Sequence, residues 1–582
     1  MAEYWPYRLP MCMALWLCMG AVLAQAPDPA SPQAVDEAGK PVADQLEAPQ
    51  PADLGPVTST AIPGDAQLES GGVRIGRIDI KVVDVFDPEN PRESGALYRA
   101  ANYLHINTRE TTIRPQLLFK PGDAYSRHLL DETERNLRAR RYLEDASIVP
   151  IAYHPDTNTV DLLVRVHDVW TLNPGATLGR SGGVNRSGVQ IDESNFLGLG
   201  KTIAVDHIQD VDRSAWKFVY RDPNLLSSRW EMQARYHDTS DGGLQGLTVE
   251  HPFYSLNTRW SAGIDGLRDK RMDQRFEQGV AVDRYRTVQE LATVQGGWST
   301  GLQRNDAGPA WVGRVLLGYR IDEQTYRPDP VLGTTLLPAD RHLRYPLLGL
   351  AWFQDLYEVT RNRDKIGLTE DLYIGRALSM NLGYASKAWG SDRNAWLVNL
   401  AFKDVFHLGE RQLLFANVAI DGRRENGRWQ GTVFSGALRY DLRQGPKRLL
   451  TVLFNHAHSE NPDDSQQLYL GSDEGLRGYP LRYRSGTQRS VLNIEQRFYA
   501  DKQILRLLSV GGAAFVDVGR IRGGAMTAPG GNRTVADFGV GLRLGNIRSS
   551  RGDIFHVDVA YPLNAEGDDR KVQFSVETKT SF

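Results

Sequence analysis

The chain has 582 residues, with 68 Lys and Arg against 71 Asp and Glu, so its formal net charge at pH 7 is -3. This length leaves room for several domains, and the nearly balanced charge gives no indication of nucleic-acid binding. The only two cysteines, Cys12 and Cys18, lie close to the N-terminus, where they cannot supply a disulfide framework for the rest of the chain.

The N-terminus predicts a cleaved secretory signal over residues 1–24. A short apolar run, 11–24, follows Arg8, and the small residues Ala24 and Ala26 suit a signal peptidase. The run is shorter than the roughly 20 apolar residues that a membrane-spanning helix needs. Both cysteines lie inside this signal, so the mature chain is expected to contain no thiol.

Residues 25–72 predict a disordered, acidic tether. Between 26 and 70 there are eight prolines, nine alanines and eight acidic residues, but no aromatic residue. Such a segment buries too little apolar surface to offset the entropy lost on ordering.

Residues 73–170 predict a small α+β domain. Apolar and polar residues alternate in its strands, Ser126 can cap a helix, and an extra helix-like insertion lies around 93–103. The expected order is a strand, helices and a hairpin of two strands, over 78–82, 126–141, 146–153 and 160–166.

Residues 171–582 predict a transmembrane antiparallel β-barrel, which makes the fold mostly β. The last twelve residues alternate between an apolar face that ends at Phe582 and a polar face that begins at Lys571. A strand that crosses a bilayer needs about 9–11 residues with this period, and it must belong to a closed barrel because hydrocarbon satisfies no backbone group. Similar segments suggest an even number of strands, up to about twenty.

The most specific motif is a glycine-flanked arginine in a long connection before the last strands: Gly475, Leu476, Arg477, Gly478 and Tyr479. Alternation along the strands that follow places Asp517, Glu495 and Arg497 on polar faces that we expect to line the lumen. A guanidinium cannot lose its proton, so a loop that folds Arg477 into the lumen needs carboxylate partners, and Asp517 and Glu495 are the best placed. A solvated surface loop is the alternative.

These motifs resemble those of the BamA/TamA family of outer-membrane barrels. The resemblance rests on 476–479, 493–497, 515–519, 538–543 and 558–563, and on 118–125 and 141–146 for the polypeptide-transport-associated (POTRA) domain. It implies one POTRA-like domain, a sixteen-stranded barrel and an Arg477 inserted against Asp517. The chain departs from the family at 549–553, where a Gly-Pro element is absent, and in its larger number of candidate strands.

The first strand, 173–183, predicts a weak seam with the last strand, which ends at Phe582. Glycine weakens strand pairing, and this strand contains Gly175, Gly179 and Gly182. We expect cysteines at Thr177 and at a residue such as Glu577 to bridge the seam. The alternative is that the glycines serve only a hairpin turn.

The resemblance implies an insertase or translocase that assembles or passes polypeptides through this lateral seam. We therefore expect the barrel in the outer membrane and the N-terminal domain in the periplasm. Its expected partners are outer-membrane lipid, unfolded or secreted client polypeptides and periplasmic or assembly-machine proteins, with no nucleic acid. A two-partner secretion exporter of one passenger and a passive pore remain as alternatives, and the sequence does not identify the client.

We expect no enzymatic activity, no cofactor and no metal. Two matches to the nucleophile pattern G-x-S-x-G, 179–183 and 297–301, lie in strand-like surroundings and not at a strand-to-helix turn. His456 and His458 share a strand face, but no third ligand stands at a useful spacing.

Overall fold

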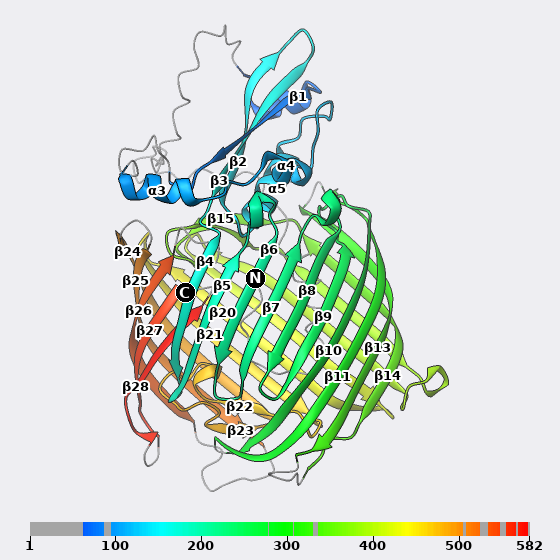
Figure 1. Ribbon diagram of the computed structural model, residues 1–582, viewed down its shortest axis with the longest axis vertical. Helices are drawn as coiled ribbons and strands as arrows, with labels where there is room; N and C mark the ends of the chain where they lie inside the picture. The colour runs from blue at the N-terminus through cyan, green and yellow to red at the C-terminus, as the bar shows by residue number, and fades with distance from the viewer. Residues whose placement is uncertain are drawn as a thin grey trace.

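A small α+β domain lies over one end of a large closed β-barrel (Figure 1). The computed structural model describes residues 62–86, 95–277, 279–305, 308–329, 336–504, 508–523, 534–546, 554–565 and 569–579. The expected signal, most of the expected tether and Phe582 lie outside these residues. We call the barrel opening that faces the domain the near mouth, and the opposite opening the far mouth.

The N-terminal domain has a three-stranded sheet in which β3 is central, parallel to β1 and antiparallel to β2. Its elements are α2 (Asp65–Ser70), β1 (Arg74–Val83), α3 (Ala96–Leu104), α4 (Glu110–Ile113), η1 (Arg114–Gln116), α5 (Arg127–Arg138), β2 (Leu143–His154) and β3 (Thr159–Asp168). Helix α5 buries Leu130, Thr133 and Leu137, which lie three and four residues apart and therefore share one face. In the described part of the chain, no helix is both long and apolar enough to span a bilayer.

The expectation of disorder as far as residue 72 is wrong for the end of that segment. Helix α2 lies within it, and its Leu68 is fully buried in the core of the domain. Asp65 accepts a hydrogen bond from the Tyr125 hydroxyl, which ties the helix to the segment before α5. One apolar side chain is enough to order this short helix because the sheet already provides the surface that it covers.

Twenty antiparallel strands of the described residues close the barrel, with the short β12 (Gln303–Asn305) as an extra piece beside β13. The count is even, as a barrel requires, and it exceeds the sixteen that the family resemblance implied. The strands are β4 (Leu172–Ser181), β5 (Val184–Glu193), β6 (Thr202–Gln209), β7 (Ser214–Asp222), β8 (Glu231–Thr239), β9 (Gly242–His251), β10 (Trp260–Glu277), β11 (Val280–Ser299), β13 (Gly308–Pro328), β14 (Arg341–Gln354), β17 (Ala377–Ala385), β18 (Ala395–Gly409), β19 (Gln412–Glu425), β20 (Arg428–Arg443), β21 (Arg448–Glu460), β24 (Gln488–Ile504), β25 (Leu508–Arg522), β26 (Val535–Asn546), β27 (Ile554–Pro562) and β28 (Gln573–Lys579).

Strand β26 illustrates how the two faces of the wall differ. Phe538, Val540 and Leu542 are 48%, 60% and 43% exposed on the isolated chain, whereas Asp537 and Arg543, which flank this run, are fully buried. Successive side chains of a strand point to opposite faces. The apolar side chains therefore face outward, where lipid would cover them, and the charged side chains face a filled lumen.

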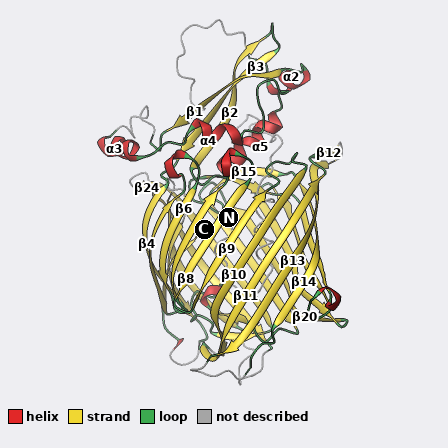
Figure 2. Cartoon of the chain, turned by 45° about the vertical axis from the view of Figure 1, so that its right-hand side comes forward, coloured by secondary structure: helices red, strands yellow, loops and turns green. Residues whose placement is uncertain are grey.

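The N-terminal domain is docked on the near mouth through α5 (Figure 2). Arg138 forms a bidentate ion pair with Asp371, with both N···O distances at 3.0 Å. The His128 Nε2 atom lies 2.8 Å from the Asp355 carboxylate, and the backbone N–H of Leu256 donates to Glu132 over 2.7 Å. The domain and the barrel are therefore joined by charge pairs.

Two additional small sheets lie within connections of the barrel. The hairpin β15 (Tyr357–Arg361) and β16 (Thr369–Tyr373) belongs to the connection between β14 and β17, at the near mouth. The pair β22 (Leu468–Leu470) and β23 (Arg484–Gly486), with η5 (Ser472–Glu474), belongs to residues 461–487 between β21 and β24, which we call the far loop. The remaining short helical turns are η2 (Phe196–Gly198), η3 (Leu225–Ser227) and η4 (Lys387–Trp389).

Candidate functional site

The far loop folds back against the inner wall of the barrel instead of extending into solvent. Leu476 and Tyr479 are fully buried and pack with Leu470 and Val491. The Tyr479 hydroxyl donates to the backbone oxygen of Ala536 over 3.1 Å. The loop is therefore held by an apolar cluster as well as by its charges.

Arg477 lies at the centre of this arrangement and contacts both predicted carboxylates. Its Nε and Nη2 atoms donate to the two oxygens of Asp517 over 2.8 and 2.9 Å, and Nη1 donates to Glu495 over 2.6 Å. Its Cζ atom lies 3.3 Å from the centroid of the Phe515 ring. Asn493 donates to Asp517 over 2.8 Å and to the Gly475 backbone oxygen over 2.6 Å, which fixes the carboxylate and the loop together.

Glu495 is shared among three arginines. Besides Arg477, its other oxygen accepts from Arg497 Nε over 2.9 Å, and Arg543 Nη2 lies 3.7 Å away. Arg543 in turn pairs with Asp558. We call Arg477, Glu495, Arg497 and Asp517 the lock; ion pairs of this kind, removed from water and well hydrogen-bonded, lose much when one partner is deleted.

The geometry of the loop explains why two positions of the motif are glycine. A Cβ atom at Gly478 would lie 2.5 Å from the Cβ atom of Asp537, a buried residue directly opposite Asp517 on the neighbouring strand. Gly475 adopts a φ of +93°, in the left-handed region that glycine enters without strain. The loop thus approaches the wall so closely that no other residue fits at 478.

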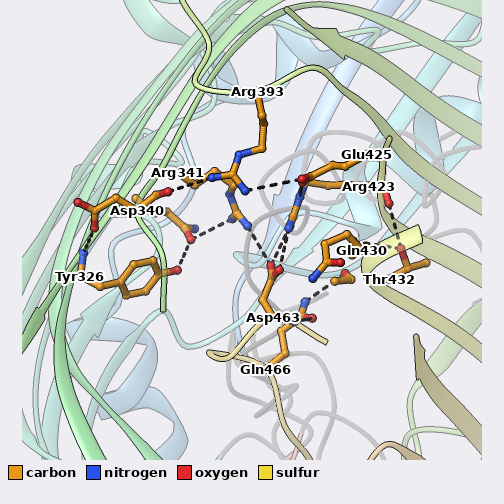
Figure 3. A network of polar contacts seen from close by, with 12 residues as sticks. Tyr326, Asp340, Arg341, Arg393, Arg423, Glu425, Gln430, Thr432, Asp463 and Gln466 are labelled. Carbon is orange, nitrogen blue, oxygen red and sulfur yellow. Dashed lines mark hydrogen bonds and ion pairs between the residues drawn. The ribbon is translucent and has the colours of Figure 1, made fainter. Parts of the chain in front are cut away.

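A second set of charges anchors the beginning of the far loop to β14 and β19 (Figure 3). Asp463 accepts from Arg423 over 2.8 and 2.7 Å and from Arg341 over 3.1 Å, while Arg423 also donates to Glu425 over 2.8 Å. Further along the loop, Arg482 forms a bidentate pair with Asp212, at 3.0 and 2.6 Å. The loop is therefore attached to three separate parts of the barrel wall.

The seam between β4 and β28 is the most sparsely paired junction among the described strands. Its register contains one residue pair, Val576 with Arg180, against seven for β27–β28 and ten for β4–β5. The antiparallel register places Glu577 opposite Gly179, so the expected pairing of Thr177 with Glu577 is wrong by two residues.

Of the three predicted seam glycines, Gly179 lies beside a described residue of β28. A Cβ atom at Gly179 would lie 3.2 Å from the Val576 backbone oxygen, whereas one at Gly175 would meet Gln190 on β5. Gly182 adopts a φ of +54° in the β4–β5 turn, and its backbone oxygen accepts from Leu481 of the far loop over 3.2 Å. The turn interpretation therefore holds for Gly182, and the fourth predicted seam residue, Phe582, lies outside the described residues.

The other candidate sites are the two G-x-S-x-G segments and the pair of histidines. The two G-x-S-x-G segments lie on β4 with its turn and at the end of β11. The His456 ring contacts Ser490 and the His458 ring contacts Glu460, so the two histidines have separate partners. In the described residues, no three His, Cys, Asp or Glu side chains are grouped closely enough to hold a metal ion.

The sequence comparisons point to one class of protein. Residues 105–168 match the POTRA family model, described as a surface antigen variable number repeat. Over 191 residues the chain is 27% identical to an outer membrane protein assembly factor from Treponema pallidum (strain Nichols). That match covers 30% of this chain and 22% of the relative, so the two share only a fraction of the relative's length.

Among solved structures, the chain is similar to BamA from Haemophilus ducreyi lacking POTRA domains 1–3. The identity is 12%, 87% of this chain and 84% of that chain are covered, and the TM-score is 0.37. CdiB from Escherichia coli gives 13% identity, 86% and 76% coverage and a TM-score of 0.42. Similarity at this identity and TM-score says nothing about the role of this chain.

A POTRA segment followed by a closed antiparallel barrel defines an outer-membrane β-barrel with a POTRA domain. With the assembly-factor relative, these findings agree with the resemblance to outer-membrane proteins of the BamA/TamA type.

We predict that Arg477→Ala lowers the stability of the barrel by about 3–5 kcal/mol, because it leaves Asp517 buried without its cation and removes one of the three arginines around Glu495. Arg477→Lys should lose less, since it keeps the charge but not the two parallel hydrogen bonds to Asp517. The measurement is a double-mutant cycle on Arg477 and Asp517, by denaturant unfolding in detergent. Strictly additive effects of Arg477→Ala and Asp517→Asn would contradict a direct interaction.

We also predict that docking of the N-terminal domain weakens as pH rises. Glu132 belongs to α5 and is buried where the domain docks. This burial raises the pKa of Glu132 to about 7, so the docked state favours the protonated carboxyl. The groups that face it are His128, Arg135, Asp355 and Arg314. Docking should be strongest at a pH below the ordinary pKa of a Glu side chain. It should weaken as the pH rises to about 7 and stay constant above that. The free energy of docking should fall by roughly 3 kcal/mol over this interval.

The measurement is the distance distribution between spin labels at Val149 of the domain and Leu178 of β4, at pH 5 and pH 8. Glu132→Gln is the matched control, because an amide still accepts from Leu256 but does not titrate. The distribution should broaden at pH 8 only in the parent chain. Equal broadening in both proteins would exclude Glu132 as the cause.

Proposed function

We propose that the protein is an insertase or translocase of the BamA/TamA type, which assembles or passes polypeptides through the seam between β4 and β28. In this proposal the barrel lies in the outer membrane and the N-terminal domain in the periplasm. Its partners are outer-membrane lipid, unfolded or secreted client polypeptides, and periplasmic or assembly proteins that reach the POTRA domain. No catalytic step is required, because a client strand gains hydrogen bonds and apolar burial as it pairs with an open edge.

The sparse seam is the observation that carries this proposal. Val576 and Arg180 form its one registered pair within the described residues, so opening there breaks fewer ladder hydrogen bonds than opening at any neighbouring junction. Strand edges with unpaired N–H and C=O groups are templates for an incoming strand. A junction of this kind is therefore suited to lateral exchange with a client.

The filled lumen supports a lateral route over the two alternatives. A passive pore and a two-partner exporter both move material along the barrel axis. In this chain the far loop occupies the lumen from the far mouth through Arg477, and the β15–β16 hairpin occupies it from the near mouth through Arg363, whose Nη1 atom donates to Asp441 over 2.9 Å. An axial route requires both segments to leave, whereas lateral exchange does not require an open axial channel.

A disulfide across the seam tests the proposal. Cysteines at Arg180 and Val576 stand directly opposite each other, and we expect them to form a bond that blocks client assembly without unfolding the barrel. The predicted mature chain contains no other cysteine. The readout is assembly of an outer-membrane client into vesicles that contain the oxidised protein, before and after reductant.

The pair Thr177→Cys with Glu577→Cys is the matched control, since its positions are out of register by two residues and should not crosslink. Activity that is lost on oxidation and restored by reductant only in the Arg180 and Val576 pair supports lateral opening. Full activity in the crosslinked protein would exclude it and favour an axial route.

A further inference from the structure

The β15–β16 hairpin connects the N-terminal domain to the lock. It belongs to residues 355–376, a long connection at the near mouth, where transmembrane barrels usually have short turns. Its base contacts α5, and its tip, residues 362–368, reaches the inner wall formed by β20, β21 and β24–β27. One segment therefore touches both the docked domain and the wall that holds Arg477.

The base of the hairpin is held by charges from α5. Asp371 on β16 receives both hydrogen bonds from Arg138, and Asp355 just before β15 is paired with His128. The Arg135 guanidinium lies 5.8 Å from the ring centroid of Tyr357, which is itself buried against the wall. Undocking of α5 would leave both carboxylates at the mouth without these partners.

The tip of the hairpin is packed against the wall beside the seam strands. Ile366 is buried in a cluster with Leu449, Tyr499, Ala513 and Ile554, residues of β21, β24, β25 and β27. These contacts make the tip an internal support for that side of the barrel.

Two ion pairs hold the tip against β20. Arg363 pairs with Asp441 on β20 at 2.9 Å, and Asp364 pairs with Arg439 at 2.7 Å. Arg363 is almost completely buried, so its position depends on these contacts and not on solvent.

The tip contacts the lock through a backbone carbonyl group. The Arg363 oxygen accepts from Arg497 Nη1 over 2.8 Å, while Nε of the same guanidinium donates to Glu495, the partner of Arg477. A planar guanidinium joined at two edges keeps a fixed orientation. The tip therefore positions Arg497, and Arg497 positions Glu495.

The contact between the tip and Arg497 stabilises the lock because it keeps water away from the buried ion pairs. Exposed ion pairs contribute little, whereas breaking a buried pair is costly. Glu495 and Arg497 are each only 8% exposed with the tip in place. Withdrawal of the tip would admit water beneath the lock and weaken the hold of Glu495 on Arg477.

We propose that the β15–β16 hairpin is a strut through which docking of the N-terminal domain controls the lock. With α5 docked, the hairpin base is fixed and its tip keeps Arg497 and Glu495 in place under Arg477. When α5 undocks, the base loses its contacts with Arg138 and His128, the tip withdraws and the far loop is released. Arg363 is a positioning residue in this arrangement. The coupling between docking and the lock is measurable without any client, so its test does not depend on the insertase proposal.

Hydrogen exchange of the full-length protein in lipid nanodiscs tests the coupling. The base variant combines His128→Gln with Arg138→Gln, and the tip variant is Arg363→Gln. The matched control is Arg361→Gln, the same substitution at an exposed side chain of the same hairpin. We expect exchange over residues 472–486 to rise at least about fivefold in the base and tip variants and to stay unchanged in the control.

The base variant is decisive because, among the described residues, no hydrogen bond or ion pair joins α5 to the far loop. Its substitutions lie outside the barrel, so it still tests the proposal if the tip variant fails to fold. Arg363→Lys should restore most of the protection, since it keeps the cation beside Asp441. Linkage also requires the reverse effect: Arg477→Lys should raise exchange over α5 by a similar factor. Faster exchange in the hairpin with far-loop exchange equal to the control would overturn the proposal.

Discussion

The arrangement of the barrel depends on one permanently charged side chain held away from water. The Arg477 guanidinium cannot be neutralised, so its place in the lumen exists only because Asp517 and Glu495 supply charge and hydrogen-bond acceptors at 2.6–2.9 Å. Glu495 in turn needs Arg497, and Arg497 uses the carbonyl of Arg363. Removal of any member leaves a buried charge on its neighbour, which makes these residues behave as a unit and not as separate pairs.

The same constraint explains how the lumen of so wide a barrel is filled. Twenty strands enclose more space than their own side chains can fill, and chain segments enter from both mouths to occupy it. Each entering segment carries polar backbone and charged side chains, and each is matched by charge from the wall: Asp463 by Arg423 and Arg341, Arg482 by Asp212, Arg363 by Asp441. The result is a barrel closed by contacts that can be exchanged for water, and not by a continuous apolar core.

The sequence predicted the parts of this arrangement that follow from local periodicity. Alternation along β25 and β24 placed Asp517 and Glu495 on the lumenal face, and the structure buries both residues. It could not give the contacts between distant segments, such as Arg138 with Asp371 or Arg363 with Asp441, because nothing local indicates which lumenal charges meet. Arg543 and Asp558 lay inside recognised motifs, yet their pairing needed the strand register. Gly182 was misplaced for a similar reason, since a glycine that weakens a strand and one that forms its turn look alike in sequence.

The far loop also explains how a seam with so few ladder contacts stays closed. On one side of the seam, Leu481 donates to Gly182 in the β4–β5 turn; on the other, Tyr479 donates to Ala536 on β26, and Arg477 holds Asp517 on β25. The loop therefore spans the seam from within the lumen, and β4 cannot move far from β28 while both sets of contacts persist. Weak pairing at the edge and a strong buried lock behind it are complementary: the first lowers the cost of separating the strands, and the second prevents their separation until the lock is released.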